Sequence, residues 1–187
     1  MANVDAAFGF RPIKSDGAPY SGQTERVVFL ATEDQAAFIG DPVKIQTGAA
    51  DATGTPAVIV CTAGQPVFGV ITSFEADADN LSNKTRLTLT KRFAQVVRVD
   101  NLEFEVQAST NPGLASVGSN IAMITPTTGS TTTGLSAAEI VTPTVATSGD
   151  CQIVRGVNRE GNDLTASNSV WVVKFNNVRG RSGALGT

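Results

Sequence analysis

Short runs of alternating apolar and polar residues recur along most of the chain and predict β-strands. The runs begin at Glu25 and are separated by turn residues such as Gly, Pro, Asp and Asn. The predicted strands cover residues 26–30, 43–45, 57–61, 67–71, 86–91, 94–99, 103–107 and 170–175. Helical spacing is weak, and only residues 33–39 and 135–140 could form a short helical turn. The pattern therefore predicts an all-β fold, either a compact β-barrel or a β-sandwich.

The two ends of the chain differ from this strand-forming middle. The N-terminal segment contains Phe8 and Phe10 on either side of a glycine, and no strand or helix period runs through it. Two Phe side chains on a free arm would expose apolar surface to water, so we expect the arm to dock onto another surface. We divide the chain into an extended N-terminal arm, a β domain and a short C-terminal tail, which cover residues 1–24, 25–176 and 177–187.

A long stretch within the predicted β domain, residues 106–149, has an unusual composition. Its only charged residue is Glu139, and it is rich in Thr, Ser, Gly and Ala. This composition is typical of a flexible loop. Thr also suits strands, so the stretch could instead form a low-charge β surface that packs against another protein. The sequence leaves both interpretations open.

Composition and charge narrow the classes of partner. The chain has 187 residues, with 14 basic and 17 acidic side chains and a net charge of −3. This balance argues against a basic surface that grips nucleic acid. No apolar run approaches the roughly 20 residues of a membrane helix, and no signal peptide precedes the strands. We therefore expect no nucleic-acid partner, no membrane partner, and synthesis in a cytoplasm.

The candidate chemistry is sparse. The chain has no His, which removes the usual general base of Ser-His and Cys-His sites and the commonest transition-metal ligand. The acidic run at residues 75–80 lacks calcium-loop spacing, because Leu81 stands where an oxygen ligand is needed. It is interpreted as a solvated turn. Cys61 and Cys151 are interpreted as two buried core thiols, with a disulfide as the alternative, and Trp171 as a core aromatic.

From these observations we predict no enzyme activity, no catalytic residue, no cofactor and no metal site. Carboxylate-only chemistry such as glycoside hydrolysis stays open in principle. However, no pair of acidic residues is singled out by its sequence context.

An ordered series of short segments carries a resemblance to a known family. The series comprises Ala2-Asn3, Ala7-Phe8-Gly9-Phe10-Arg11-Pro12, Pro19-Tyr20-Ser21-Gly22 and Gly40-Asp41-Pro42-Val43, with looser matches at 69–70, 104–107, 134–136 and 171–174. With this series the chain resembles the head decoration, or capsid cement, proteins of tailed bacteriophages. The resemblance implies a small β-fold subunit, often trimeric, on the outside of an icosahedral head.

The function implied by this resemblance is structural. We expect a virion protein that is made in the host cytoplasm, binds the major capsid protein on the capsid exterior and stabilises the shell, with a homotrimer as the favoured oligomer. We hypothesise that Phe8 and Phe10 anchor in apolar pockets of the shell and that Arg11 pairs with a capsid carboxylate, with Pro12 in the same capsid-binding set. Changing both Phe residues to Ala would then weaken head binding and leave the β domain folded.

Other contacts and functions are weighed against this expectation. Residues 106–149 are a second candidate contact with the shell. One alternative function is another virion component, such as a tail or head-completion protein. Another is a carbohydrate-binding β module, although one Trp and one Tyr in the whole chain count against it.

Overall fold

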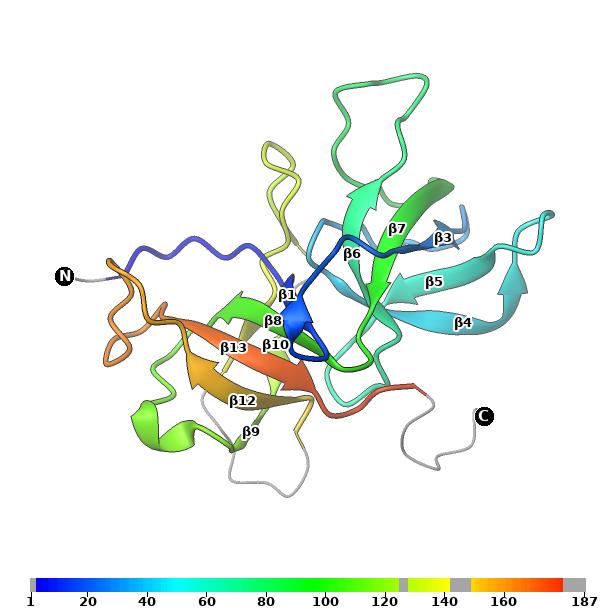
Figure 1. Cartoon of the computed structure of the whole chain (residues 1–187). Helices are drawn as coiled ribbons and strands as arrows, with labels where there is room; N and C mark the ends of the chain where they lie inside the picture. Colours follow the sequence, from blue (N-terminus) through cyan, green and yellow to red (C-terminus); the bar gives the residue numbers. More distant parts are fainter. Residues whose placement is uncertain (1–2, 125–127, 142–148, 180–187) are drawn as a thin grey trace.

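Nearly all regular structure in the protein is β-strand (Figure 1). The computed structural model describes residues 3–124, 128–141 and 149–179. The strands form a closed five-stranded barrel, a six-stranded sheet and a two-stranded ladder. Within the described residues the single helix is a short 3-10 turn, η1 (Leu114–Ser116). The all-β prediction is therefore confirmed, and the molecule contains both a barrel and a second sheet.

The barrel occupies a continuous part of the chain. Its strands are β3 (Glu25–Phe29), β4 (Pro42–Ala50), β5 (Pro56–Val60), β6 (Gly69–Phe74) and β7 (Arg92–Arg98), in the order β3-β5-β4-β6-β7. Only the β3–β5 pair is parallel. Inward-pointing side chains of these strands, together with Ala37 and Phe68 from adjoining loops, form the barrel core. Its members are Val27, Phe29, Ala37, Val43, Val58, Val60, Phe68, Ile71, Ala94 and Val96. Closure pairs every barrel strand on both sides, which removes exposed edges.

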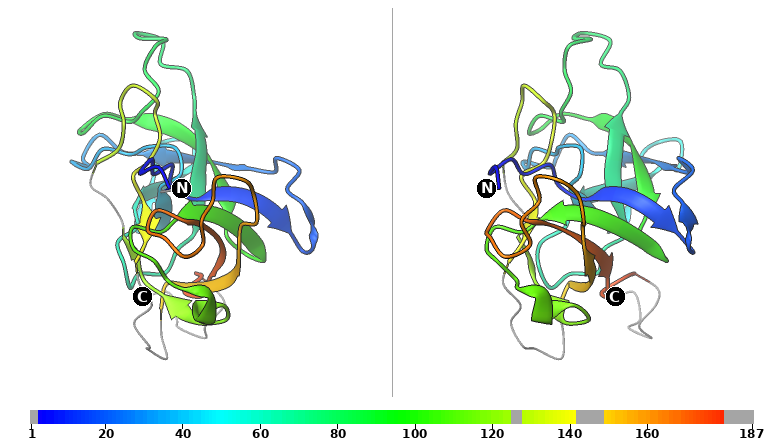
Figure 2. Two further views of the ribbon diagram at one scale, coloured as in Figure 1. Left: turned by 90° about the vertical axis from the view of Figure 1, so that its left-hand side faces the viewer. Right: turned by 60° about the vertical axis from the view of Figure 1, so that its left-hand side comes forward.

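The predicted strand at residues 86–91 is wrong. These residues belong to a loop between β6 and β7, which stands out from the barrel in each view (Figures 1 and 2). The alternation of Leu87 and Leu89 imitates a strand, but both side chains are exposed, and the buried residue of the segment is Arg86. The predicted helical turn at 33–39 is also absent. Ala37 forms an isolated bridge with Arg86 instead.

The six-stranded sheet is antiparallel and draws on both ends of the chain. Its strands are β1 (Arg11–Ser15), β2 (Ala18–Pro19), β8 (Leu102–Gln107), β9 (Asn120–Ile121), β12 (Cys151–Gly156) and β13 (Val170–Phe175), in the order β2-β1-β8-β13-β12-β9. The ladder of β10 (Met123–Ile124) and β11 (Glu139–Ile140) completes this body. The ambiguous segment 135–140 therefore ends in a strand rather than a helix.

The core under this sheet contains the residues that the sequence placed there. Trp171 is fully buried, and its indole N–H donates to Ser169 Oγ at 2.8 Å. Cys61 and Cys151 are both buried and free, so their interpretation as core thiols is confirmed. Burial raises the pKa of Cys61 to about 12 and that of Cys151 well above its usual value. Both groups therefore stay protonated thiols near neutral pH.

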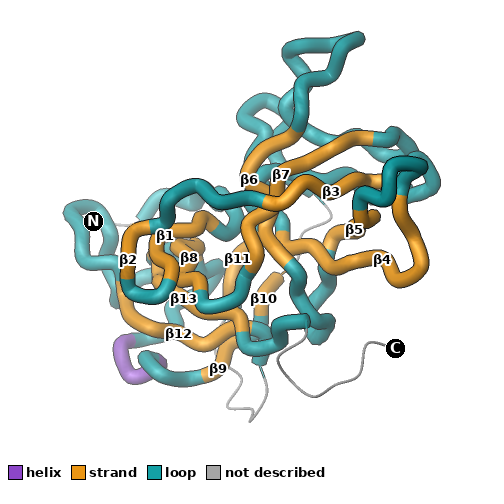
Figure 3. The backbone as a smooth tube through the Cα atoms, turned by 45° about the vertical axis from the view of Figure 1, so that its right-hand side comes forward, coloured by secondary structure: helices purple, strands orange, loops and turns teal. Residues whose placement is uncertain are grey.

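The chain runs from the sheet into the barrel and back again (Figure 3). Two connectors join the bodies: residues 20–24 lead from β2 to β3, and residues 99–101 lead from β7 to β8. The predicted β domain at 25–176 thus contains a whole barrel but only part of the sheet. The missing sheet strands come from the segment that was expected to be an arm.

The prediction of an extended arm over residues 1–24 is wrong for β1 and β2, because these two strands pair into the sheet. Phe10 is 2% exposed and packs against Phe175 and Phe104, with ring centroids 4.8 and 6.4 Å apart. The backbone approaches the barrel closely here, because Phe10 N–H donates to Gly40 O at 2.9 Å. A Cβ on Gly9 would lie only 2.7 Å from that same oxygen, which explains the glycine between the two Phe residues.

The C-terminal boundary also shifts. Val178 is 2% exposed and bridges Val67. Val67 N–H donates to Asn177 O at 2.8 Å, and Arg179 N–H donates to Val67 O at 3.1 Å. Residues 177–179 are therefore part of the fold, and the rest of the predicted tail, 180–187, lies outside the described residues.

The low-charge stretch 106–149 packs mainly on its own protein. Its described residues, 106–124, 128–141 and 149, place Ile121, Met123, Ala138 and Ile140 in the core below the sheet. The interpretation as one flexible loop is wrong for these residues. Part of the surface that was expected to contact a partner is therefore buried in the protein's own core. Residues 125–127 and 142–148 lie outside the described part of the chain.

Candidate functional site

The four residues predicted to bind a capsid do not form one surface. Phe10 is buried in the core, so its role as an external anchor is wrong. Phe8 is half-buried, and the exposed Arg11 places its guanidinium carbon 4.7 Å from the centre of the Phe8 ring. Pro12 is half-buried within β1. Phe8 and Arg11 therefore remain available to a partner as a stacked pair.

The residues that precede Phe8 are held against their own protein. The Asn3 side chain donates to Asp163 O at 2.9 Å and accepts from Asp163 N–H at 2.8 Å. Gln107 donates through Nε2 to Val4 O at 2.8 Å and accepts from Ala6 N–H at 3.2 Å through Oε1. The described N-terminal segment is therefore anchored at two points and is not a free arm.

The loop between β6 and β7, residues 75–91, gathers exposed apolar side chains, and we call it the leucine loop. Leu81, Leu87 and Leu89 are 82%, 50% and 61% exposed. Single exposed leucines are common, but these are three of the six large apolar side chains that stand exposed in the described residues. Their concentration on one projecting loop is typical of a contact surface.

Two buried arginines hold the leucine loop from beneath. The Arg86 side chain is fully buried and donates to the carbonyl oxygens of Leu30, Glu33, Gln35 and Thr90. Arg92 is 9% exposed and donates to the carbonyl oxygens of Glu75, Asn83 and Thr85. Burial lowers the pKa of both guanidinium groups, yet each stays charged at neutral pH. The loop backbone is thus fixed by a network of charge-assisted hydrogen bonds.

The backbone at Leu89 shows how firmly the loop is held. Its φ of 56° lies in the left-handed region, which is unfavourable for a large L-residue. Leu89 N–H donates to Glu33 O at 2.8 Å, and this bond helps to hold the conformation. Nearby, Lys84 Nζ donates to Thr132 O at 3.1 Å and ties the loop to the neighbouring loop at 128–136. The segment around Leu89 and the stem at Lys84 are therefore held in one conformation.

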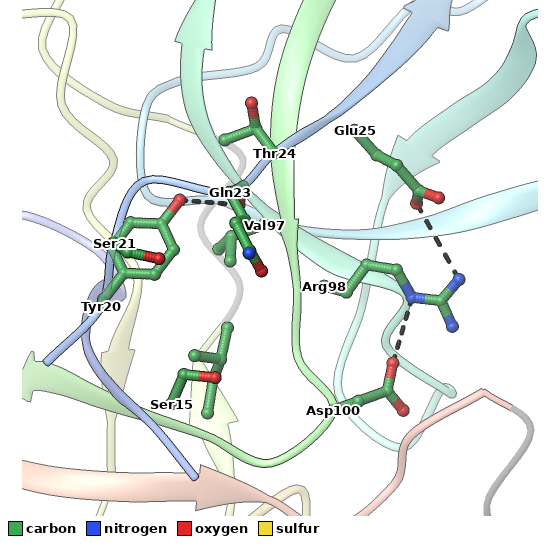
Figure 4. A pocket seen from close by; sticks show the side chains of 10 residues that line it. Ser15, Tyr20, Ser21, Gln23, Thr24, Glu25, Val97, Arg98 and Asp100 are labelled. Atoms are coloured by element: carbon green, nitrogen blue, oxygen red, sulfur yellow. Dashed lines mark hydrogen bonds and ion pairs between the residues drawn. The ribbon is translucent and has the colours of Figure 1, made fainter. Parts of the chain in front are cut away.

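A second surface feature is a cleft between the two bodies, which we call the junction cleft (Figure 4). It has a volume of about 270 Å³ and is lined by both connectors and by the adjoining ends of β1, β3, β7 and β8. Tyr20 and Ser21 stand on one side, and Glu25, Arg98 and Asp100 stand on the other. The Tyr20 hydroxyl donates to Gln23 O at 2.9 Å, which fixes the ring.

The charged side of the junction cleft is a three-residue network. Arg98 Nε lies 3.0 Å from Asp100 Oδ2, and its Nη1 lies 3.9 Å from Glu25 Oε2. The Arg98 guanidinium carbon also lies 4.9 Å from the centre of the Phe68 ring. Two carboxylates around one guanidinium give the cleft a local net charge of −1. All three side chains are well exposed, so the pairs contribute little to folding stability.

The acidic run at 75–80 is an exposed turn, as expected. Asp77 accepts hydrogen bonds from Asp79 N–H at 3.1 Å and from the Asn83 amide at 3.0 Å. The bond from Asn83 is the main cause that lowers the pKa of Asp77. Over the described residues, no cluster of three or more His, Cys, Asp or Glu side chains is placed to hold a metal ion.

A buried carboxyl group links the barrel to the low-charge stretch. Asp41 is 1% exposed, and it accepts from Phe38 N–H at 2.8 Å and from the Ser136 hydroxyl at 2.5 Å. Burial raises the pKa of Asp41 to about 7, against the opposing effect of these two hydrogen bonds. The folded protein therefore binds a proton at Asp41 more tightly than the unfolded chain does.

We expect Asp41 to make stability fall as pH rises. Its contribution is fully present below about pH 4 and is lost as pH approaches about 7, because folding then forces a carboxylate into a buried site. The loss is about 4 kcal/mol, at about 1.4 kcal/mol for each unit of pKa shift. The side chain in Asp41→Asn has a hydrogen-bond acceptor and a donor but does not ionise. The free energy of unfolding of this variant should therefore not show the decline that Asp41 causes between about pH 4 and about pH 7.

Urea unfolding of the wild type and of Asp41→Asn at pH 5 and pH 8 checks the Asp41 prediction. The difference in the free energy of unfolding between these two proteins isolates the effect of Asp41 from that of the other acidic groups. Equal differences at both pH values would contradict a raised pKa for this group.

The sequence did not predict the leucine loop or the junction cleft. The one available signal for the loop was the presence of three leucines in a segment rich in Asn, Ser and Thr. Leu87 and Leu89 were instead interpreted as part of a strand, and Leu81 as part of the acidic turn. No protein-family model, no curated protein and no solved structure matches this chain.

Proposed function

We propose that the protein is a structural virion protein that binds the outside of a phage capsid and stabilises the shell. The observation that carries the proposal is the leucine loop, a projecting loop that carries three exposed leucines and whose base is held by buried Arg86 and Arg92. The resemblance of residues 7–12 to head decoration proteins supports the same role. Among the described residues, no helix is long and apolar enough to cross a bilayer.

In this proposal the leucine loop is the main contact with the major capsid protein. Each leucine side chain contributes about 1.5–3 kcal/mol when it is transferred fully from water into an apolar pocket. Because the backbone is already fixed, little conformational entropy is lost on binding. Phe8 and Arg11 form a second, smaller contact that replaces the anchor first expected from Phe8 and Phe10 together.

Binding stabilises the shell through mass action. A protein that binds only the expanded shell stabilises that shell relative to disrupted forms. The stabilisation grows with the ratio of the protein's free concentration to its dissociation constant. A homotrimer would present three leucine loops and three Phe8–Arg11 pairs to one local symmetry axis of the shell. Linked contacts of this kind raise the effective concentration of each.

We expect a variant with Leu81, Leu87 and Leu89 all changed to Asn to bind phage heads at least about a hundredfold more weakly than the wild type, from the apolar transfer energies alone. The fold should be retained, because all three side chains are exposed. The measurement is co-sedimentation with expanded heads that lack the protein, over a range of protein concentrations.

The matched control for the leucine variant is Leu114→Asn. Leu114 is 60% exposed but lies on the sheet body, in η1, so its change should leave head binding as in the wild type. If the triple variant binds like the wild type, the leucine loop is not the contact. If the wild type saturates at only a few copies per particle, a tail or head-completion role replaces decoration.

A further inference from the structure

We infer that the junction cleft is a binding site for a neutral carbohydrate of one or two sugar units. This site is separate from the leucine loop and does not depend on the proposed role at the capsid. The cleft lies where both connectors cross between the barrel and the sheet. Small-molecule sites occur preferentially at such junctions, and a volume of about 270 Å³ lies just below their usual range, which suits a small ligand.

The two sides of the cleft match the two kinds of surface on a pyranose ring. A sugar ring has an apolar C–H face and a girdle of hydroxyl groups that both donate and accept hydrogen bonds. Tyr20 supplies an aromatic ring on one side, next to the largely buried side chain of Val97. On the opposite side, Glu25 and Asp100 supply acceptors and Arg98 supplies donors.

The rim adds groups of the same kind. Hydroxyls from Ser15 and Ser21 and the amide of Gln23 line the cleft, and each can donate and accept. Thr24 lies beside them, and its hydroxyl is hydrogen-bonded to Gln95 Oε1 at 3.2 Å. This mixture suits a ligand with many neutral hydroxyls.

Charge argues against the other common small ligands. Glu25 and Asp100 outnumber Arg98, so an approaching phosphate, sulfate or nucleotide meets a net negative charge. The guanidinium is also already paired on two sides. Carboxylates that face a neutral ligand instead accept charge-assisted hydrogen bonds from its hydroxyls.

The cleft is also organised before any ligand arrives. The Tyr20 ring is fixed by the bond from its hydroxyl to Gln23 O, and Arg98 is fixed by Asp100 and by the Phe68 ring. Groups held in this way lose less freedom when a ligand binds. Sites with few contacts of this type bind in the millimolar range.

The test uses defined sugars with the full-length protein. Glucose, galactose, N-acetylglucosamine, maltose and lactose are titrated by saturation-transfer NMR and calorimetry, with inorganic phosphate as the charged comparison. We expect saturable millimolar binding of at least one sugar and no binding of phosphate. Tyr20→Ala should weaken that binding by at least about tenfold, as for other aromatic anchors.

Two further variants keep the test decisive. Tyr20 packs partly against the core, so Tyr20→Ala removes core packing as well as the aromatic ring. The Glu25 side chain is well exposed, so a loss of sugar binding by Glu25→Gln is independent of folding. Arg155→Gln, which breaks a pair with Glu103 away from the cleft, should bind the sugar like the wild type. The inference is overturned if no sugar saturates, if phosphate binds more tightly, or if Tyr20→Ala and Glu25→Gln both bind like the wild type.

Discussion

Replacing Phe10 by Ala is expected to lower the free energy of unfolding by about 3–5 kcal/mol, the usual range for a buried Phe in a core. The Phe10 ring is 2% exposed and packs against Phe104 and Phe175, so its removal leaves a cavity where the N-terminal segment meets β8 and β13. Neighbouring side chains cannot fill this space without shifting strands. Urea unfolding followed by tryptophan fluorescence measures the loss, because Trp171 lies in the same core.

Phe8→Ala is the matched control for Phe10→Ala. Phe8 is two residues away, is only half-buried and stacks on the exposed Arg11, so its loss should cost no more than about 1 kcal/mol. Equal destabilisation by the two changes would contradict the placement of Phe10 in the core. The variant with both residues changed is now expected to be much less stable, which makes it unsuitable for testing head binding.

Replacing Arg86 by Met is expected to lower the free energy of unfolding by about 3–5 kcal/mol. Methionine has a similar length but donates no hydrogen bond. Four backbone carbonyl oxygens lose the Arg86 donor in this variant: those of Leu30, Glu33, Gln35 and Thr90. Leu30 O and Glu33 O each keep one backbone N–H donor. This differs from replacing both partners of a buried ion pair, which is often neutral.

Arg98→Met provides the comparison for Arg86→Met. The Arg98 side chain is 48% exposed and makes only surface pairs, so its loss should cost no more than about 1 kcal/mol. Arg86→Met should also weaken binding to phage heads, because the leucine loop loses its support. Similar stability for the two variants in urea would show that Arg86 does not hold the loop.

The barrel was largely predictable because its signal is local. Strands such as Pro56–Val60 are runs of apolar residues between turn residues, and this pattern is visible without knowledge of their partners. The division into a barrel and a sheet was not predictable, because strand order depends on pairings between distant segments. β1, for example, pairs with β8 about ninety residues later in the chain.

The errors came from residues whose role depends on distant contacts. Phe10 is a core residue only because Phe104 and Phe175 form its pocket, and the sequence near Phe10 contains no period that shows this. Arg86 is a buried charge, which contradicts the usual rule for arginine and depends on several carbonyl groups that converge on it. Leu87 and Leu89 beside it were therefore assigned to one face of a strand that does not form.

The candidate sites were predicted less well than the fold. Of the four residues expected to bind a capsid, Phe8 and Arg11 remain in the proposal, and Phe10 is removed. The junction cleft combines side chains from residues 15–25 and 97–102, and only the folded chain brings these two segments together. The sequence argued against carbohydrate binding because the chain contains one Trp and one Tyr, yet that Tyr, Tyr20, is the aromatic residue of the cleft.

The most direct test of the proposed function is the number of copies bound to a phage head. Purified protein is mixed with expanded phage heads that lack it, and bound copies are counted after sedimentation as the protein concentration is raised. We expect saturable binding at hundreds of copies per head, distributed over the repeated surface of the shell. An absence of saturable binding, or saturation at a few copies per particle, would contradict the proposal that this protein decorates and stabilises the capsid.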